Sequence, residues 1–161
     1  MAKMLMISTN LMQDPYPVYP LGANLVASAV RNAGHTVKMV DMLFDGADVL
    51  ESTIREFEPD FIGFSMRNVD NVNFNDPTSF VFQYRELVAR IKKLTSVPVI
   101  AGGTAFTIFP RQFLDFLGAD YGIAGPGEIS LPKLISSLES GEKPGNPIII
   151  GETDRTGENS Y

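Results

Sequence analysis

The chain has 161 residues, of which 44% are hydrophobic, so it is long enough for one domain around a single core. Its formal net charge is −6 and its 13 lysines and arginines are scattered, which argues against a basic face for nucleic acid. With no cysteine and one histidine, the chain cannot form disulfides, bind zinc through thiolates or hold an iron–sulfur cluster through cysteines.

Short apolar runs alternate along the chain with longer segments that have the spacing of amphipathic helices. Most of the apolar runs lack the polar alternation of a half-exposed sheet, so they predict strands buried on both faces. In chain order the predicted elements are strand 3–8, helix 21–34, strand 36–42, helix 46–58, strand 60–66, helix 77–94, strand 97–102, helix 108–118, strand 120–125 and helix 127–141.

The strict alternation of strand and helix predicts an α/β fold with a parallel sheet, because each crossover is right-handed and lays a helix on one face. Five such units favour a five-stranded, flavodoxin-like sheet in the order 2-1-3-4-5, with helices on both faces. Gly34 and Gly118 stand where a left-handed residue would end a helix, which agrees with this assignment.

The composition changes after residue 141, where a Pro/Gly stretch precedes a short apolar run and a polar tail. We therefore predict one domain over residues 1–141 and a linker, or the start of a following domain, over residues 142–161. Since the sequence has no long apolar run and no secretory cleavage site near its start, we expect a cytoplasmic protein.

A ligand of an open parallel sheet binds beyond the carboxyl ends of the strands, beside the point where the strand order reverses. Five predicted loops lie at that edge, and the first and third are longer than such connections usually are, which is a hint of function. The loops cover residues 9–22, 43–46, 67–77, 102–107 and 125–128. His35 precedes the second strand at the opposite edge, where we expect a solvated turn residue and no ligand contact.

The motifs of these loops each have a structural and a functional interpretation. Gly102 and Gly103 form either a tight turn or a bare backbone surface for a flat ligand. The GxGxxS pattern at 125–130 is a weak phosphate motif, because it follows the fifth strand and also suits a helix start. Glu128 either caps that helix or accepts a hydrogen bond from a ligand. The YPLG stretch at 19–22 either closes a long loop or presents helix N–H groups to an acceptor.

Other functions of this fold lack their signatures here. The first crevice loop has no Ser/Thr/Gly-rich run for a flavin phosphate, and the third strand ends in Ser65 and Met66 where a phosphoacceptor receiver domain needs an Asp. A P-loop GxxxxGK[ST] is absent from the sequence. No nucleophile–base pair can be assembled from the crevice loops, so an independent enzyme is the least favoured interpretation.

An ordered set of motifs runs through the crevice side of the chain: YPLG at 19–22, AGH at 33–35, DFIGFSMRN at 60–68, AGG at 101–103 and ADYGIAGPGE at 119–128. Through this set the chain resembles the N-terminal cobalamin-binding domains of radical S-adenosylmethionine enzymes, over residues 1 to about 141. The resemblance implies that the corrin lies over the carboxyl edge of the sheet and that its nucleotide tail is tucked between sheet and helices.

Carried over position by position, the resemblance implies that two groups of residues contact the cofactor. The residues against the nucleotide tail are Gly102, Gly103, Thr104, Gly125, Gly127 and Glu128. The residues facing the lower side of the corrin are Ser65, Met66, Arg67 and Asn68. The expected cofactor-binding set is completed, at the two ends of the first crevice loop, by Thr9, Asn10, Leu21 and Gly22.

The cobalt is expected to receive no imidazole from this chain. Methyltransferase and mutase relatives carry an Asp-x-His-x-x-Gly motif after the first strand whose His ligates cobalt, and the corresponding loop here has no His. Met66 or Arg67 is the candidate cover of the lower corrin face, and a guanidinium keeps its proton and cannot become a ligand. The structural alternative is that Arg67 pairs with Asp70 to fold the loop.

The resemblance also implies S-adenosylmethionine and a [4Fe-4S] cluster, but the CxxxCxxC motif that holds the cluster is absent from this chain. Both therefore belong to a radical domain downstream in the parent protein, which is the expected partner. The alternative is a corrin-free domain of the same fold, a packing or substrate-recognition module in which Tyr16 and Tyr19 fill the crevice.

Overall fold

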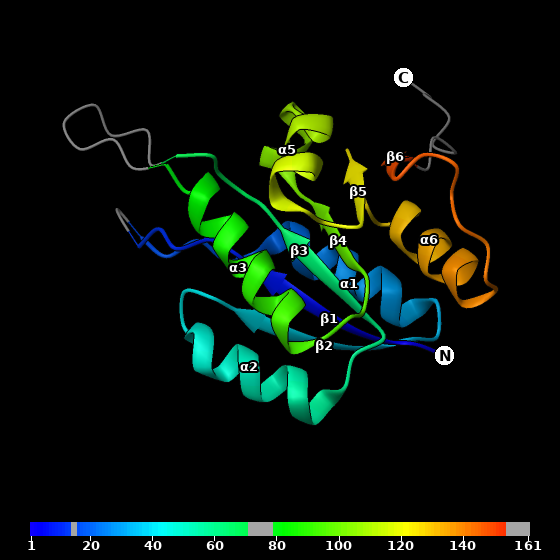
Figure 1. Ribbon diagram of the computed structural model, residues 1–161, viewed down its shortest axis with the longest axis horizontal. Coiled ribbons are helices and arrows are strands. Elements are labelled where there is room, and N and C mark those ends of the chain that lie inside the picture. Colours follow the sequence, from blue (N-terminus) through cyan, green and yellow to red (C-terminus); the bar gives the residue numbers. More distant parts are fainter. Residues whose placement is uncertain (14–15, 71–78, 154–161) are drawn as a thin grey trace, which may run out of the picture.

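The protein is built on a six-stranded parallel sheet in the order β2-β1-β3-β4-β5-β6. A computed structural model describes residues 1–13, 16–70 and 79–153. The sheet lies between two layers of helices, with α2 and α3 toward the viewer in Figure 1. The elements are β1 (Lys3–Ser8), α1 (Leu21–Asn32), β2 (Thr36–Asp41), α2 (Gly46–Phe57), β3 (Phe61–Ser65), α3 (Val81–Leu94), β4 (Val99–Gly102), α4 (Thr104–Ile108), α5 (Pro110–Leu117), β5 (Tyr121–Ala124), α6 (Ser130–Glu139) and β6 (Ile148–Ile150).

The predicted flavodoxin-like order of the first five strands is confirmed, and β6 is an additional strand. It pairs in parallel with β5, with Gly122 opposite Ile148 and Ala124 opposite Ile150. Three consecutive isoleucines suit a strand, but a run this short gives a weak signal on its own. The predicted linker over 142–161 therefore contains a strand of the sheet. Within the predicted loop 102–107, residues from Thr104 onward form the short helix α4, which the sequence analysis missed.

Each face of the sheet has its own core. On one face, Leu5, Ile7 and Phe64 pack with apolar residues of α2, α3, α4 and α5. On the other face, Met4, Met6 and neighbouring strand residues pack with α1 and α6. The strands β1, β3, β4 and β5 are buried on both faces because their side chains alternate between these two cores, as predicted. The edge strand β2 differs, because its residues are mostly exposed or half-buried.

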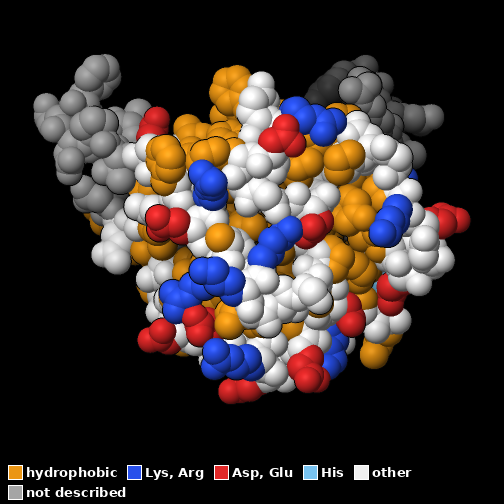
Figure 2. All heavy atoms as spheres, viewed as in Figure 1, with side chains coloured by type: hydrophobic (Ala, Val, Ile, Leu, Met, Phe, Trp, Pro, Cys, Tyr) orange, Lys and Arg blue, Asp and Glu red, His pale blue; other side chains and the backbone are white. Residues whose placement is uncertain are grey.

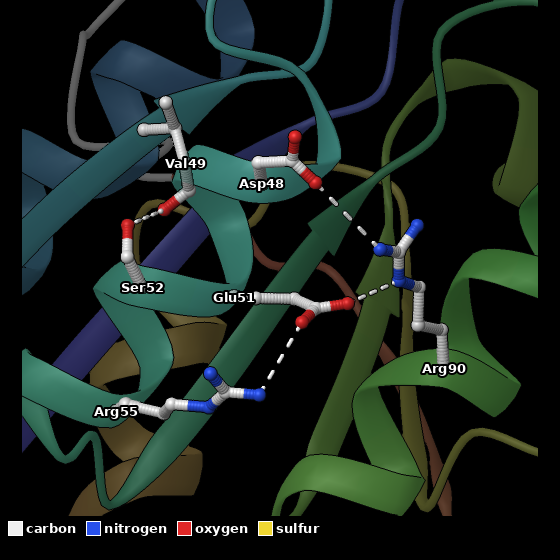
Figure 3. A network of polar contacts seen from close by, with 6 residues as sticks. All are labelled: Asp48, Val49, Glu51, Ser52, Arg55 and Arg90. Carbon is white, nitrogen blue, oxygen red and sulfur yellow. Dashed lines mark hydrogen bonds and ion pairs between the residues drawn. The ribbon is translucent and has the colours of Figure 1, made fainter.

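The helices α2 and α3 are joined at the surface by a small network of ion pairs. Arg90 of α3 reaches two carboxylates of α2, those of Asp48 and Glu51, and Arg55 also contacts Glu51 (Figure 3). The Ser52 hydroxyl donates to the Val49 carbonyl oxygen at 3.0 Å on the same helix. Positive and negative side chains are interspersed on the face that carries α2 and α3 (Figure 2). Because the arginines and Asp48 are exposed and Glu51 is half-buried, each pair contributes at most about 1 kcal/mol.

At the amino edge of the sheet, Gly34 and Gly118 have φ angles of 92° and 70°, as expected for left-handed residues after helices. His35 lies at this edge as predicted, but it is not solvated. Its side chain is 5% exposed, and its Nδ1 accepts a hydrogen bond from the Ala2 N–H at 3.1 Å. The histidine is covered because the first residues of the chain and Glu139 of α6 lie against it. Among the described residues, no helix is both long and apolar enough to pass through a lipid bilayer.

Candidate binding cavity

A cavity of about 920 Å³ lies between the sheet and the helices α1 and α6, and it opens at the carboxyl edge. Its walls come from β1, β3, β4, β5, the start of α1, the loop after β5 and the start of α6. It has the size of a typical small-molecule site. The residues that line it are Met6, Ser8, Asn10, Val18, Tyr19, Pro20, Leu21, Gly22, Ala23, Val26, Gly63, Phe64, Ser65, Met66, Arg67, Ile100, Ala101, Gly102, Gly103, Thr104, Thr107, Ile123, Gly125, Pro126, Gly127, Glu128 and Leu131.

The cavity exists because side chains on this face of the sheet become small toward the carboxyl ends of the strands. In the amino half, large side chains fill the space under α1 and α6: Met4, Phe61 and Tyr121. In the carboxyl half, the positions at the ends of the strands on the same face are small: Ser8, Ser65, Gly102 and Gly125. Since α1 and α6 keep their distance from the sheet, the missing side-chain volume is left as a hollow.

The lining changes from apolar to polar between the floor and the mouth. The floor is formed by residues that come earlier in their strands or later in α1: Met6, Ile100, Ile123 and Val26, with Leu131 of α6. The mouth carries the polar side chains of the lining: Ser8, Asn10, Tyr19, Ser65, Arg67, Thr104, Thr107 and Glu128. Within the described residues, no partner is found for the Ser8 and Ser65 hydroxyls or for the Glu128 carboxylate. These groups are available to a polar ligand.

The segment that follows β3 is fixed in place by hydrogen bonds from neighbouring elements. The Thr9 hydroxyl donates to the Ser65 carbonyl oxygen at 2.8 Å, and the Tyr84 hydroxyl donates to the Asn68 carbonyl oxygen at 2.9 Å. The Met66 N–H donates to the Gly102 carbonyl oxygen at 2.8 Å. Burial raises the pKa of the Tyr84 phenol above its ordinary value, against the opposing effect of its hydrogen bonds with Thr9 and Asn68. Backbone from Ser65 to Asn68 is therefore held as a firm ledge at the mouth.

Of the two candidate covers for the lower corrin face, only Arg67 has an accessible side chain. Met66 is 0% exposed and packs in the core on the α2 and α3 face of the sheet. Arg67 is exposed, and its carbonyl oxygen accepts a hydrogen bond from the Thr104 hydroxyl at 2.8 Å. The proposed alternative pairing of Arg67 with Asp70 is not found, since Arg67 takes part in none of the ion pairs between described residues.

The two glycines after β4 have different physical roles. Gly103 has a φ of 97°, and a Cβ there would overlap the Met66 carbonyl oxygen, so the glycine permits backbone to pack on backbone. A Cβ at Gly102 would have only the Ile123 carbonyl oxygen nearby, at 3.6 Å. Gly103 thus serves the tight turn of the structural interpretation, whereas Gly102 leaves bare backbone on the cavity wall.

Thr107 is a site residue that the sequence analysis missed. Its hydroxyl donates to the Gly103 carbonyl oxygen at 3.0 Å and accepts from the Gly125 N–H at 2.9 Å, which ties together the loops after β4 and β5. The four-residue spacing between Gly103 and Thr107 lets a helical threonine bond to the carbonyl one turn back, but the sequence predicts a loop where α4 lies.

Most of the predicted cofactor-binding residues come together around this cavity. All of them line it except Thr9 and Asn68, which lie in the hydrogen bonds that hold the ledge. The floor residues, such as Met6, Ile100 and Leu131, could not be predicted as site residues, because an apolar residue inside a strand or helix has the same pattern as an ordinary core residue.

The first crevice loop does not fill the cavity with its aromatic side chains. Tyr16 and Tyr19 are 78% and 67% exposed, and Tyr19 stands on the wall. Gly102 and Gly125 both face the hollow. The part of the third crevice loop from 71 to 77 lies outside the described residues.

Three comparisons with known proteins point in one direction. The family model described as "B12 binding domain" matches residues 8–135. Tryptophan 2-C-methyltransferase from Streptomyces laurentii is 30% identical over 128 residues, which are 78% of this chain and 21% of that protein.

Among solved structures, the radical S-adenosylmethionine methyltransferase TsrM from Kitasatospora setae, with cobalamin and a [4Fe-4S] cluster bound, is 28% identical with a TM-score of 0.78. The match covers 88% of this chain and 25% of that one. The cobalamin-dependent S-adenosylmethionine radical enzyme OxsB matches with a TM-score of 0.69, over 88% of this chain and 19% of its own chain. Its sequence is 20% identical, so this match supports the fold alone. The chain therefore spans about a quarter or less of the length of these relatives.

Proposed function

Because this chain belongs to the B12-binding domain family, we propose that it holds cobalamin at the carboxyl edge of its sheet, with the corrin over the mouth of the cavity and the nucleotide tail inside. The observation that carries this proposal is the hollow itself. It lies at the ligand-binding edge of the fold, it is made by small residues at four strand ends, and its mouth carries polar groups with no partner among the described residues.

The residues around the hollow fit such a cofactor. Gly102 and Gly22 leave open space where a side chain would stand, so the tail can approach the backbone closely. The Ser8 and Ser65 hydroxyls can donate to phosphate or ribose oxygens, and Glu128 can accept from a hydroxyl or amide. When bound, the corrin would supply a cobalt centre that carries a methyl group or an equivalent ligand.

Arg67 is the proposed cover of the lower corrin face. The crevice loops contain no histidine, so no imidazole of this chain would ligate the cobalt. The Arg67 guanidinium cannot ligate either, and its positive charge would disfavour a water on that face. The ledge that carries Arg67 is fixed by Thr104, Tyr84 and Thr9, which would keep the side chain in one region.

We further propose that the chain works as the cobalamin-binding part of a cytoplasmic radical S-adenosylmethionine enzyme. Tryptophan 2-C-methyltransferase and TsrM, which support this proposal, are several times longer than this chain. The S-adenosylmethionine and the cluster would be held by a radical domain that follows residue 161 in the parent protein.

Mixing the protein with hydroxocobalamin, desalting it and recording the visible spectrum tests the proposal. We expect corrin to stay with the protein in a one-to-one ratio, and Arg67→Ala to change the spectrum of the bound corrin or its affinity. Arg111→Ala, at an exposed arginine on α5 away from the cavity lining, is the matched control. A protein that stays folded by circular dichroism but retains no corrin would be the corrin-free module instead, and an unchanged Arg67→Ala spectrum and affinity would remove the role of Arg67.

A further inference from the structure

The floor of the cavity differs chemically from its mouth, and this difference bears on which corrinoids fit. Every polar side chain of the lining is at the mouth. The floor residues Met6, Ile100, Ile123, Val26 and Leu131 offer only hydrocarbon and one thioether. A ligand that reaches the floor must therefore end in a group that needs no hydrogen bond.

The backbone of the floor offers no hydrogen bonds either. Gly63 has no side chain, but its strand is central in the sheet, and it is in register with Met6 on β1 and with Ile100 on β4. The N–H and C=O groups of a central strand are used by its two neighbours. The side chains of the floor residues themselves contain no nitrogen or oxygen that could bond to a polar ligand edge.

The Met6 side chain covers the bare backbone of Gly63. A Cβ built on that glycine would lie 2.5 Å from the Met4 methyl carbon and 2.8 Å from the Met6 sulfur, so these two side chains share the space directly above it. A methionine in this position presents a polarizable, adjustable surface, which favours contact with the edge or face of an aromatic ring. The floor is thus suited to a flat aromatic end group with apolar edges.

We propose that this floor makes the protein selective for corrinoids whose nucleotide tail ends in a benzimidazole rather than a purine. The inference rests on the proposed binding of cobalamin and goes beyond it, because it concerns which member of the corrinoid class is bound. A dimethylbenzimidazole presents methyl groups at its far edge. An adenine presents an amino group and ring nitrogens, which would lose their hydrogen bonds to water and find none on the floor.

The affinities of three corrinoids test this selectivity. Spectrophotometric titration of the purified chain would use cobalamin, its analogue with an adenine base, and cobinamide, which has no base. We expect the adenine analogue to bind roughly 10-fold to 100-fold more weakly than cobalamin. Cobinamide is also expected to bind more weakly, because it leaves the floor uncovered.

A substitution on the floor sharpens the test. Met6→Gln keeps the length of the side chain and adds a donor and an acceptor, so it should narrow the preference for cobalamin over the adenine analogue by several-fold. Met39→Gln is the matched control, since Met39 packs against the same core but does not line this cavity. If Met6→Gln does not fold, the ratio of the affinities of the unaltered chain for cobalamin and for the adenine analogue still tests the selectivity.

The possible outcomes separate the two proposals. Equal affinities for cobalamin and the adenine analogue would overturn the selectivity, and so would a cobinamide affinity equal to that of cobalamin, since the tail would then not reach the floor. If the folded chain binds none of the three, the proposed cobalamin binding itself fails.

Discussion

At the scale of the residue, Gly102 and Gly103 are adjacent in sequence but differ in what they require. Gly103 has a left-handed φ and touches the Met66 backbone, so Gly103→Ala should lower the free energy of unfolding by roughly 1–3 kcal/mol. Gly102→Ala should change it by less than about 0.5 kcal/mol, because a Cβ there meets open cavity.

Urea unfolding and corrin titration of both variants measure this contrast. Gly102→Ala is expected to weaken corrin binding while the protein stays as stable as the unaltered chain. A Gly102→Ala protein that binds corrin with unchanged affinity would show that the ligand does not approach this wall.

Tyr84 supplies a test that depends on pH. The pKa of its phenol is raised by burial in the folded state, so the folded chain holds this proton more tightly than the unfolded chain does. The resulting stability is fully present below the unfolded pKa of about 10 and is lost as the pH rises through the folded value. The stability advantage of the unaltered chain over Tyr84→Phe should therefore shrink above about pH 10.

Urea unfolding of both proteins at pH 8 and at alkaline pH would show this. At pH 8 we expect Tyr84→Phe to cost about 1 kcal/mol, because the hydroxyl bond to the Asn68 carbonyl is lost while the ring still packs on Phe64. A difference that is the same at both pH values would contradict the assignment.

At the scale of the element, α4 places Thr107 so that one hydroxyl joins the ends of two strands. Thr107→Val keeps the shape and removes the hydrogen bonds to Gly103 and Gly125. We expect it to lower the free energy of unfolding by about 1 kcal/mol and to weaken corrin binding several-fold, since both loops line the mouth. Titration and urea unfolding measure the two effects.

Thr36→Val is the control for that variant. Thr36 is exposed on β2 and its hydroxyl makes no hydrogen bond with the described residues, so its loss should change neither quantity by a measurable amount. If Thr107→Val, like this control, changes neither the free energy of unfolding nor the corrin affinity, the hydrogen bonds of Thr107 between the two loops do not contribute to either.

At the scale of the whole molecule, β6 ties residues beyond 141 to the sheet. Ile148 is buried against β5, the Gly151 N–H donates to the Ala124 carbonyl oxygen at 2.8 Å, and the Glu152 N–H donates to the Ser130 hydroxyl oxygen at 3.0 Å. A chain cut after residue 141 should be less stable than one cut after residue 153, by roughly 2–4 kcal/mol. The predicted domain boundary at residue 141 stays a prediction that this comparison examines.

Thermal and urea unfolding of the two shortened chains would give the answer. If both unfold at the same urea concentration, β6 adds nothing to the domain and the boundary at 141 stands. If the shorter chain unfolds earlier, as we expect, the functional unit extends through Glu152.

The part of the fold that could be predicted from the sequence is the part that depends on neighbouring residues. The apolar runs of five strands, the helical spacing between them and glycines such as Gly34 are local patterns, and the alternation then restricts the sheet to very few orders. The carboxyl-edge loops follow from that order. For this reason nearly all of the predicted binding residues line one cavity.

The depth and chemistry of the cavity depended on residues that are distant in sequence. Ser8, Ser65 and Gly102 make a hollow only because their strands lie side by side and α1 and α6 stand above them. No single stretch of sequence contains that information. The burial of Met66 and His35, and the bridge made by Thr107, are likewise set by what packs against each side chain. Local pattern determined the elements and their order, whereas contacts between distant segments determined what they enclose.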